Sequence, residues 1–319
     1  MTKTMISAST AVSVDTLRTS PCNLCPRLCG ARRDEGEQGI CGAGADVVVA
    51  RAALHFWEEP PLSGEAGSGA VFFAHCPLHC VYCQNAEIAA GKAGKPVSIA
   101  RLSEICLELQ AQGALNVNFV TPTHYSSAIR EAVRDARESG LDIPVVWNTS
   151  GYERAEVVHA LADTVDVWLA DFKYADDSLA KRYSKAPDYP QVALQAIEAM
   201  VVQAGHPTFD DVDGKPRMRK GVIVRHLMLP GALGQSKRAL ELLYSRFGDT
   251  VLYSIMNQYT PVMPQSALKR CPELAHRVPD DEYDELLDFA DSLGLEDYYW
   301  QQGPAAEESF IPNWDCAGV

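Results

Sequence analysis

The chain contains no uninterrupted apolar run long enough to cross a membrane. A membrane-spanning helix needs about 18 apolar residues, whereas the longest uncharged run, over residues 66–86, is broken by His75, Pro77 and His79. Internal repeats and low-complexity tracts are also absent. We therefore expect a soluble globular protein that has no membrane partner.

Positive charge is scarce, because 28 Lys and Arg stand against 42 Asp and Glu and leave a net charge of −14. An acidic surface repels phosphate backbones, so nucleic acid is excluded as a partner. Hydrophobic residues make up 47% of the 319 positions, which is enough for a large core. The first 20 residues are too polar for a secretory signal, and we expect a flexible tail there.

The ten cysteines are placed unevenly, with seven of them in two clusters. The first cluster contains Cys22, Cys25, Cys29 and Cys41, and the second contains Cys76, Cys80 and Cys83. Such short, repeated spacings suit thiolates that converge on metal in a reducing compartment better than the disulfides of a secreted protein. The cysteines therefore predict a cytoplasmic metalloprotein.

Apolar β-rich runs alternate with helical patterns, which is typical of parallel strands joined by crossover helices. The predicted strands cover residues 70–74, 117–120, 144–148, 165–171, 222–229 and 251–256, with a seventh candidate at 298–302. The predicted helices cover residues 99–112, 126–139, 153–162, 191–203, 236–247 and 281–293. Asp213-Gly214 in the intervening segment 205–220 predicts a hairpin turn rather than a calcium loop. The pattern predicts an α/β fold.

The second cysteine cluster, Cys76-Pro-Leu-His-Cys80-Val-Tyr-Cys83, directly follows the first of the six predicted strands. Three thiolates on one tight loop are able to hold three irons of a four-iron cluster and leave the fourth iron open, whereas electron-transfer clusters are closed by a fourth Cys. Zinc is the alternative, with His75 or His79 completing a Cys3His site.

This motif, C-x3-C-x2-C with Tyr82 before the last Cys, resembles that of the radical S-adenosylmethionine superfamily. The resemblance implies a partial (β/α)6-type TIM-like barrel with a small Cys-rich N-terminal segment. It also implies a [4Fe-4S] cluster on Cys76, Cys80 and Cys83, whose open iron binds S-adenosylmethionine (SAM). In that superfamily, reductive cleavage of SAM gives a 5′-deoxyadenosyl radical that abstracts a hydrogen atom from the substrate.

Within the superfamily, the chain resembles pyruvate formate-lyase activating enzymes and their uncharacterised relatives with a Cys-rich N-terminus. The resemblance runs from about residue 22 to about 302, and its landmarks are residues 76–85, 147–152, 169–173 and 222–231. It implies hydrogen abstraction from a protein, as in glycyl-radical activation, by a monomer served by a flavodoxin- or ferredoxin-type electron donor. The alternatives are radical modification of a small molecule or peptide, and a non-catalytic iron–sulfur or zinc redox protein.

Polar residues at strand ends are the candidate cofactor ligands. The family places such groups at the carboxyl ends of strands, so Asn148 and Ser150 are assigned to SAM, with a helix cap as the alternative. Asp171 and Lys173 share one face of a strand and are assigned to the same site, with a plain ion pair as the alternative. Tyr82 in the cysteine motif completes this set.

Arg225 falls inside an apolar strand, where an unpaired buried cation is costly, so it must have a partner. By alternation Arg225 shares a face with Ile223 and Leu227, while His226 points the other way. The relatives carry an active-site Arg at this position, and we assign Arg225 the catalytic role and His226 to the core. Asn257 and Gln258, just past the next strand, are weaker candidates for the same cavity.

One departure from the superfamily is the absence of a Gly-Gly-Glu stretch after the second strand, where this chain has Val120-Thr-Pro-Thr-His-Tyr125. Thr121, Thr123 or His124 replaces those contacts, or else His124 lies in solvent. We find no catalytic carboxylate pair in the sequence.

The N-terminal cluster, Cys22, Cys25, Cys29 and Cys41, offers four thiolates and therefore a closed site for zinc or a second iron–sulfur cluster. A metal-free set of cysteines is the third possibility. The predicted organisation is a tail over 1–20, a Cys-rich metal-binding segment over 21–60, the barrel over 61–303 and a C-terminal tail over 304–319.

Overall fold

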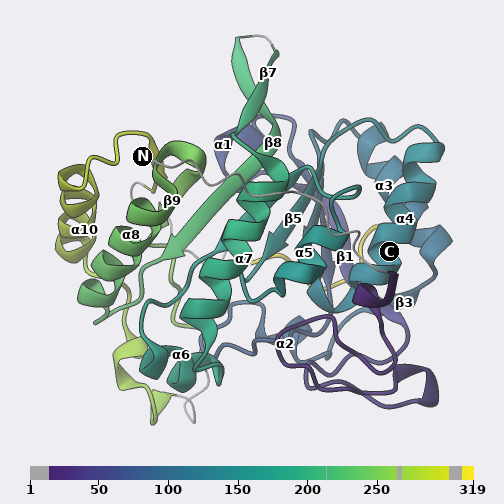
Figure 1. The fold of residues 1–319 in the computed structure, drawn as a ribbon, viewed down its shortest axis with the longest axis horizontal. Coiled ribbons are helices and arrows are strands. Elements are labelled where there is room, and N and C mark those ends of the chain that lie inside the picture. Colours follow the sequence, from purple (N-terminus) through teal and green to yellow (C-terminus); the bar gives the residue numbers. More distant parts are fainter. Residues whose placement is uncertain (1–13, 213, 264–267, 302–310) are drawn as a thin grey trace, which may run out of the picture.

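The computed structural model describes residues 14–212, 214–263, 268–301 and 311–319. Its described part contains one ten-stranded sheet wrapped by helices (Figure 1). Seven strands pair in parallel, in the order β2 (Ser68–Phe73), β4 (Val117–Val120), β5 (Val145–Thr149), β6 (Val167–Asp171), β8 (Lys215–Leu227), β9 (Leu252–Met256) and β10 (Tyr298–Trp300). The six predicted strands and the seventh candidate are thus confirmed.

Three further strands run antiparallel and were not predicted. They are β1 (Val47–His55) beside β2, β3 (Lys95–Val97) beside β1, and β7 (Thr208–Val212) beside β8. β7 and β8 form a hairpin that pairs Val212 with Lys215, which confirms the predicted turn. Asp213 of that turn lies outside the described residues, as does the predicted tail up to residue 13.

The long helices lie outside the curved sheet (Figure 1). They are α3 (Ile99–Ala111), α4 (Ser126–Glu138), α5 (Ala155–Ala160), α6 (Asp177–Ser184), α7 (Tyr189–Ala204), α8 (Leu233–Phe247) and α10 (Asp280–Ser292). Short helical turns are α1 (Pro60–Ser63), α2 (Ala86–Ala89) and the 3-10 turns Val14–Leu17, Arg33–Glu35, Thr123–Tyr125, Gly248–Thr250 and Pro272–Ala275. The unpredicted α6 begins where the Asp176 side chain accepts the Leu179 amide at 2.9 Å, as an N-cap does.

The sheet runs from β10 at one edge to β3 at the other, and no pairing between these edges closes it in the described part of the chain. The predicted α/β fold with an open, partial barrel is therefore confirmed. β1 belongs to this sheet although it lies within the predicted segment 21–60. The C-terminal residues pack on β1, since Cys316 N donates to Ala50 O at 3.1 Å and Ala52 N to Ala317 O at 2.9 Å.

Strand alternation decides what faces the inside of the sheet. Val146, Leu169 and Ile223 belong to a buried apolar cluster at the amino-terminal side of the strands. Two residues further along the same faces, the chain places Asn148, Asp171 and Arg225. An apolar floor thus lies below a polar layer near the carboxyl ends of the strands. Among the described helices, none combines the length and the apolar character that crossing a membrane requires.

Candidate functional site

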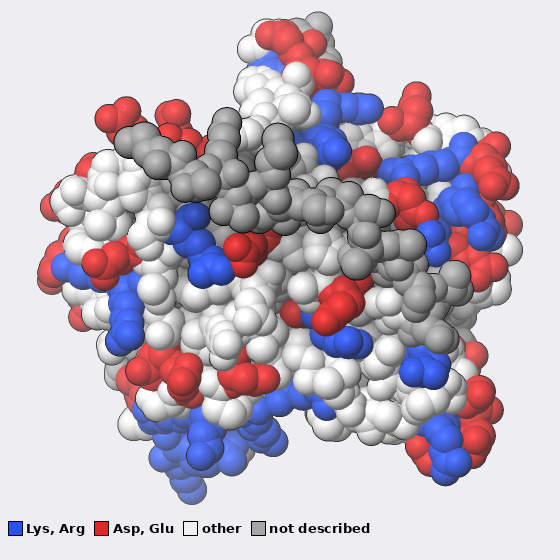
Figure 2. Space-filling model, in the orientation of Figure 1, with Lys and Arg blue, Asp and Glu red and all other residues white. Residues whose placement is uncertain are grey.

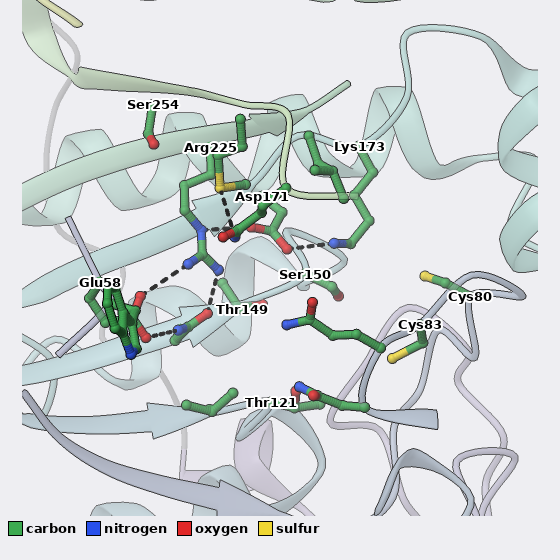
Figure 3. Close-up of a pocket in the computed structure, with 18 of the residues that line it drawn as sticks. Glu58, Cys80, Cys83, Thr121, Thr149, Ser150, Asp171, Lys173, Arg225 and Ser254 are labelled. Carbon is green, nitrogen blue, oxygen red and sulfur yellow. Dashed lines mark hydrogen bonds and ion pairs between the residues drawn. The ribbon is translucent and has the colours of Figure 1, made fainter. Parts of the chain in front are cut away.

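A cavity of about 320 Å³ opens at the carboxyl ends of the parallel strands. Cys76, Cys80 and Cys83 line one end of it, and Glu58 and Glu59 line the other. Figure 3 shows Glu58 on the opposite side from Cys80 and Cys83. The cavity therefore joins a group of thiols to a group of carboxylates.

The thiol end is built by the loop that follows β2. Sγ of Cys76 accepts the amide of Leu78 at 3.4 Å, and Sγ of Cys80 accepts the Ser184 hydroxyl at 3.1 Å. Burial, together with the neighbouring thiols, raises the pKa of Cys76 to about 11 and that of Cys83 to about 12. The protein alone does not favour these thiolates, so a bound cation would supply the charge that stabilises them.

The geometry does not support the zinc alternative at this loop. His79 Nε2 lies 3.2 Å from the carbonyl oxygen of Ile40, and the His75 ring packs against Gly42 and Gly91. In the part of the chain that the structure describes, no three His, Cys, Asp or Glu side chains are arranged to hold a single metal ion. In an iron–sulfur cluster each thiolate binds a different iron, so three ligands need not converge on one point.

Arg225 forms the centre of a buried polar network in the middle of the cavity (Figure 3). Its Nε donates to Asp171 Oδ1 at 2.9 Å, its Nη1 to Glu58 Oε2 at 3.2 Å and its Nη2 to Asn148 Oδ1 at 2.6 Å. The sequence-based requirement for a partner is therefore confirmed, with three partners from three different parts of the chain. These bonds hold the guanidinium in one orientation.

Asp171 and Lys173 form an ion pair, with 2.5 Å between Nζ and Oδ2. Burial opposes the charge on both groups, but the attraction outweighs it. The pKa of Asp171 is lowered by Arg225 and Lys173, and that of Lys173 is raised chiefly by Asp171. Both residues also line the cavity, so the pair is part of the candidate site.

Most of the predicted site residues meet at this cavity. Its walls include Tyr82, Thr121, Asn148, Ser150, Asp171, Lys173 and Arg225, together with the three cysteines. The helix-cap alternative for Asn148 and Ser150 is wrong, because α5 begins after Arg154 and has no side-chain cap. Gln258 lines the cavity as well, whereas Asn257 does not.

Two residues of the loop after β4 lie elsewhere. His124 is fully buried behind the cavity wall, with Nε2 2.8 Å from the carbonyl oxygen of Ala74, so the prediction that it contacts the cofactor or lies in solvent is wrong. The Thr123 hydroxyl donates to Glu153 Oε1 at 2.6 Å and is also outside the cavity. Only Thr121 of the three candidates borders the cavity, in a left-handed conformation with φ of +58°. His226 packs in the core as predicted, with Nδ1 2.7 Å from Phe172 O.

Glu58 and Glu59 line the cavity as well and were not predicted from the sequence. Glu59 is buried, the side chain of Glu58 is 7% exposed, and burial raises the pKa of each carboxyl. They lie in the connection between β1 and β2, and β1 was itself not predicted. The available signal was an acidic pair set between Trp57 and Pro60, where apolar neighbours on both sides indicate burial.

The N-terminal cysteines come together next to the thiol loop. Cys22, Cys25 and Cys41 are buried, and Cys29 is partly exposed. Burial raises the pKa of Cys25 and Cys41, and the charges of the neighbouring thiols add to the rise.

The N-terminal segment also contacts the loop that carries Cys76, since Arg27 Nε donates to Pro77 O at 3.0 Å. Buried Arg33 lies 3.7 Å from Cys41 Sγ through Nη2 and has no carboxylate ion-pair partner among the described residues. A buried cation in this position favours negative charge on the thiols.

Residues 71–211 match the family model described as the Radical SAM superfamily. An uncharacterised protein of Methanocaldococcus jannaschii, MJ0674, is 28% identical over 289 residues, which cover 87% of this chain and 76% of that protein. SuiB of Streptococcus suis, solved with its precursor peptide SuiA, aligns over 71% of this chain and 46% of its own, with 14% identity and a TM-score of 0.48. A radical SAM methyltransferase from Sphaerobacter thermophilus aligns over 74% of this chain and 67% of its own, with 14% identity and a TM-score of 0.47. The chain thus spans less than half the length of SuiB.

Proposed function

This chain carries a radical SAM superfamily domain, and on that premise we propose that it cleaves SAM reductively and abstracts a hydrogen atom from a substrate. The observation that supports the proposal most is that the three thiols and the Arg225 network line one cavity. In this arrangement a cofactor held at the thiols would face a substrate held at the network.

The residues of the thiol loop fit a [4Fe-4S] cluster. Cys76, Cys80 and Cys83 would hold three irons, and the fourth iron, with SAM bound, would supply the carbon radical of the reaction. Lys173 and Asp171 would bind charged groups of SAM, and Asn148 and Ser150 would bind neutral polar groups, since all four line the cavity.

Anaerobic reconstitution with iron and sulfide, followed by SAM and dithionite, tests the reaction. We expect 5′-deoxyadenosine from the wild type and none above background from Cys80→Ala, because the cluster loses a ligand. Cys106→Ala is the matched control, since Cys106 is a buried thiol in α3 away from the cavity. Equal product from the wild type and Cys80→Ala would leave a non-catalytic metal protein as the better explanation.

We propose that the substrate is a protein, as in glycyl-radical activation. The open sheet supports this, because the cavity extends to two exposed residues, Trp57 and Trp300. Trp57 is 64% exposed and lies in the connection after β1, and Trp300 is 49% exposed and lies in edge strand β10. A macromolecule is able to present a segment there without entering as a whole. A radical signal on a candidate protein substrate, by electron paramagnetic resonance, would support this role. Turnover of small molecules alone would favour the alternative.

We propose an acidic flavodoxin- or ferredoxin-type protein as the electron donor. Although the chain is acidic, Figure 2 shows Lys and Arg gathered at the lower edge of the molecule, where Figure 1 places α6. α6 ends in exposed Lys181 and Arg182, and its last residue, Ser184, contacts Cys80. This basic surface therefore adjoins the thiol end and attracts acidic partners.

Charge reversal tests this surface. Lys181→Glu with Lys185→Glu should lower the rate with a flavodoxin donor at low salt and leave the rate with dithionite unchanged, because only the protein donor needs the surface. Lys220→Glu, on the β7–β8 hairpin, is the control. Equal flavodoxin-dependent rates in all three proteins would contradict the assignment.

For the N-terminal cysteines we propose a second iron–sulfur cluster, with zinc as the alternative. Arg33, whose Nη2 lies 3.7 Å from Cys41 Sγ, supports a site that carries negative charge. In a variant without Cys76, Cys80 and Cys83, we expect iron and sulfide to remain in anaerobically purified protein. Stoichiometric zinc without sulfide would favour the alternative.

The short, repeated spacings of seven cysteines suit metal ligation in a reducing compartment, and we propose the cytoplasm. We also propose that the protein acts as a monomer. Sedimentation of the reconstituted protein at micromolar concentration should give a single species of one chain, and a dimer would refute this.

A further inference from the structure

The end of the cavity opposite the thiols contains a carboxylate oxygen without a donor among the described residues. Glu59 is 7% exposed and lines the cavity, and no described residue donates a hydrogen bond to its Oε2. A buried acceptor without a donor is costly, and such an atom in a cavity indicates a missing ligand.

The Ser254 hydroxyl hydrogen-bonds to the Glu59 carboxyl and the charge of Arg225 attracts it, but no described neighbour donates to Oε2. Arg225 uses its three donor nitrogens on Asp171, Glu58 and Asn148. Lys173 is paired with Asp171. Arg225 and Lys173 therefore donate to other groups, and neither donates a hydrogen bond to Oε2 of Glu59.

The charges of the cavity wall do not balance either. Three carboxylates, Glu58, Glu59 and Asp171, stand against two cations, Arg225 and Lys173. Burial raises the pKa of the Glu59 carboxyl, so its ionised form needs an opposite charge nearby. A water molecule would supply a hydrogen bond alone, whereas a cationic nitrogen supplies both the hydrogen bond and the opposite charge.

The rest of this end also suits a cation. Trp57, Tyr299 and Trp300 line the cavity together with Glu59, and the charge of Glu59 acts on the Tyr299 hydroxyl. Aromatic faces beside a carboxylate are a usual environment for ammonium and guanidinium groups. Tyr299 and Trp300 belong to β10, at one edge of the open sheet, so a side chain entering from that edge passes them first.

We propose that Glu59 binds a positively charged nitrogen of the substrate, so that the substrate is a molecule or peptide segment with an ammonium or guanidinium side chain. This inference rests on the proposed function and names the substrate class of the same cavity. The cation at Glu59 would hold the substrate at the end away from the thiols and leave the rest of it between Glu59 and the cofactor.

Binding tests this without turnover. Ligand-observed NMR with the reconstituted full chain and SAM compares four amides: Nα-acetyl-lysine, Nα-acetyl-arginine, Nα-acetyl-norleucine and Nα-acetyl-glutamate. We expect at least tenfold tighter binding of the lysine or the arginine ligand than of the norleucine ligand, and the weakest binding for glutamate. The two cationic arms distinguish an ammonium site from a guanidinium site. No preference for either cation over norleucine in the wild type would overturn the proposal, and this result does not depend on any variant.

A charge-removing variant then locates the site. Glu59→Gln should reduce the cation preference to less than threefold, and Glu59→Asp should keep part of it. Glu65→Gln, which removes an exposed carboxylate of the same connection, should keep all of it. An undiminished preference in Glu59→Gln would place the cation elsewhere and overturn the assignment. Formation of 5′-deoxyadenosine, measured separately in the wild type, tests the proposed reaction. A cation preference without SAM cleavage would contradict the proposed reaction and leave the cation site standing.

Discussion

Replacing Arg225 by Met should destabilise the protein strongly, and the loss should depend on pH. The variant keeps most of the side-chain volume but leaves Glu58 and Asp171 buried without their shared cation. Removing one partner of a buried ion pair costs about 3–5 kcal/mol. Two carboxylates lose their shared cation. Asp171 retains Lys173, whereas Glu58 retains only the neutral Asn118 and Asn148 amides, so we expect a loss of about 5 kcal/mol at pH 8.

The direction of the pH effect follows from Glu58. Burial already raises the pKa of Glu58, and Arg225 opposes that rise. Without Arg225 the folded-state pKa increases further, so the folded variant binds a proton that the unfolded chain releases above a pKa of about 4.3. Folding stability of the variant therefore decreases as the pH rises from that value towards the folded-state pKa, by up to about 1.4 kcal/mol per pH unit. The deficit should shrink at pH 5.5.

Urea unfolding followed by circular dichroism, under anaerobic conditions at pH 5.5 and pH 8, measures both effects. Arg134→Met is the matched control, because Arg134 pairs with Asp135 on the surface, its side chain is 63% exposed, and such pairs contribute about 0–1 kcal/mol. A loss below about 1 kcal/mol for Arg225→Met at pH 8, or one that grows towards pH 5.5, would refute the electrostatic account of this network.

Three further changes test other parts of the structure. Ser184→Ala should lower the midpoint potential of the proposed cluster, because it removes the hydroxyl that donates to Cys80 Sγ. A redox titration followed by electron paramagnetic resonance measures this potential, and an unchanged or higher value would contradict the prediction. Gly151→Ala should lower the folding stability by about 1–3 kcal/mol, because the new Cβ would overlap the carbonyl oxygen of Asp171 and Gly151 has a φ of +75°. It should also weaken SAM binding in equilibrium dialysis, and wild-type affinity would argue against a role of that strand end. Leu62→Ala should cost about 2–5 kcal/mol in urea unfolding, since Leu62 is fully buried in the apolar floor, and a smaller loss would mean that the floor collapses around the gap.

The fold and half of the site could be predicted from local patterns. The runs that became β2, β4, β5, β6, β8 and β9 are apolar on both faces, which only a covered parallel sheet requires. Alternation placed Arg225 and Leu227 on the cavity side of β8 and His226 on the other. These predictions succeeded because they depend on residues that are near one another in the chain.

The errors arose where the answer depended on distant parts of the chain. His124 was expected at the cofactor or in solvent, but the carbonyl oxygen of Ala74, 50 positions away, holds it behind the wall. Glu58 meets Arg225 across 167 positions, and β1 has to join the sheet antiparallel before that connection reaches the cavity. The sequence pattern of residues 47–60 does not predict this pairing of β1 or the contact between Glu58 and Arg225.

The sequence by itself determined the open α/β sheet, the thiol loop and the order of polar residues at the strand ends, because spacing and alternation are properties of a short stretch of chain. Only the tertiary structure decided that Glu58 and Glu59 face the thiols across one cavity, and that Glu59 keeps an unsatisfied oxygen there. Burial and charge balance are sums over all the segments that surround a point, so they exist only once the chain has folded.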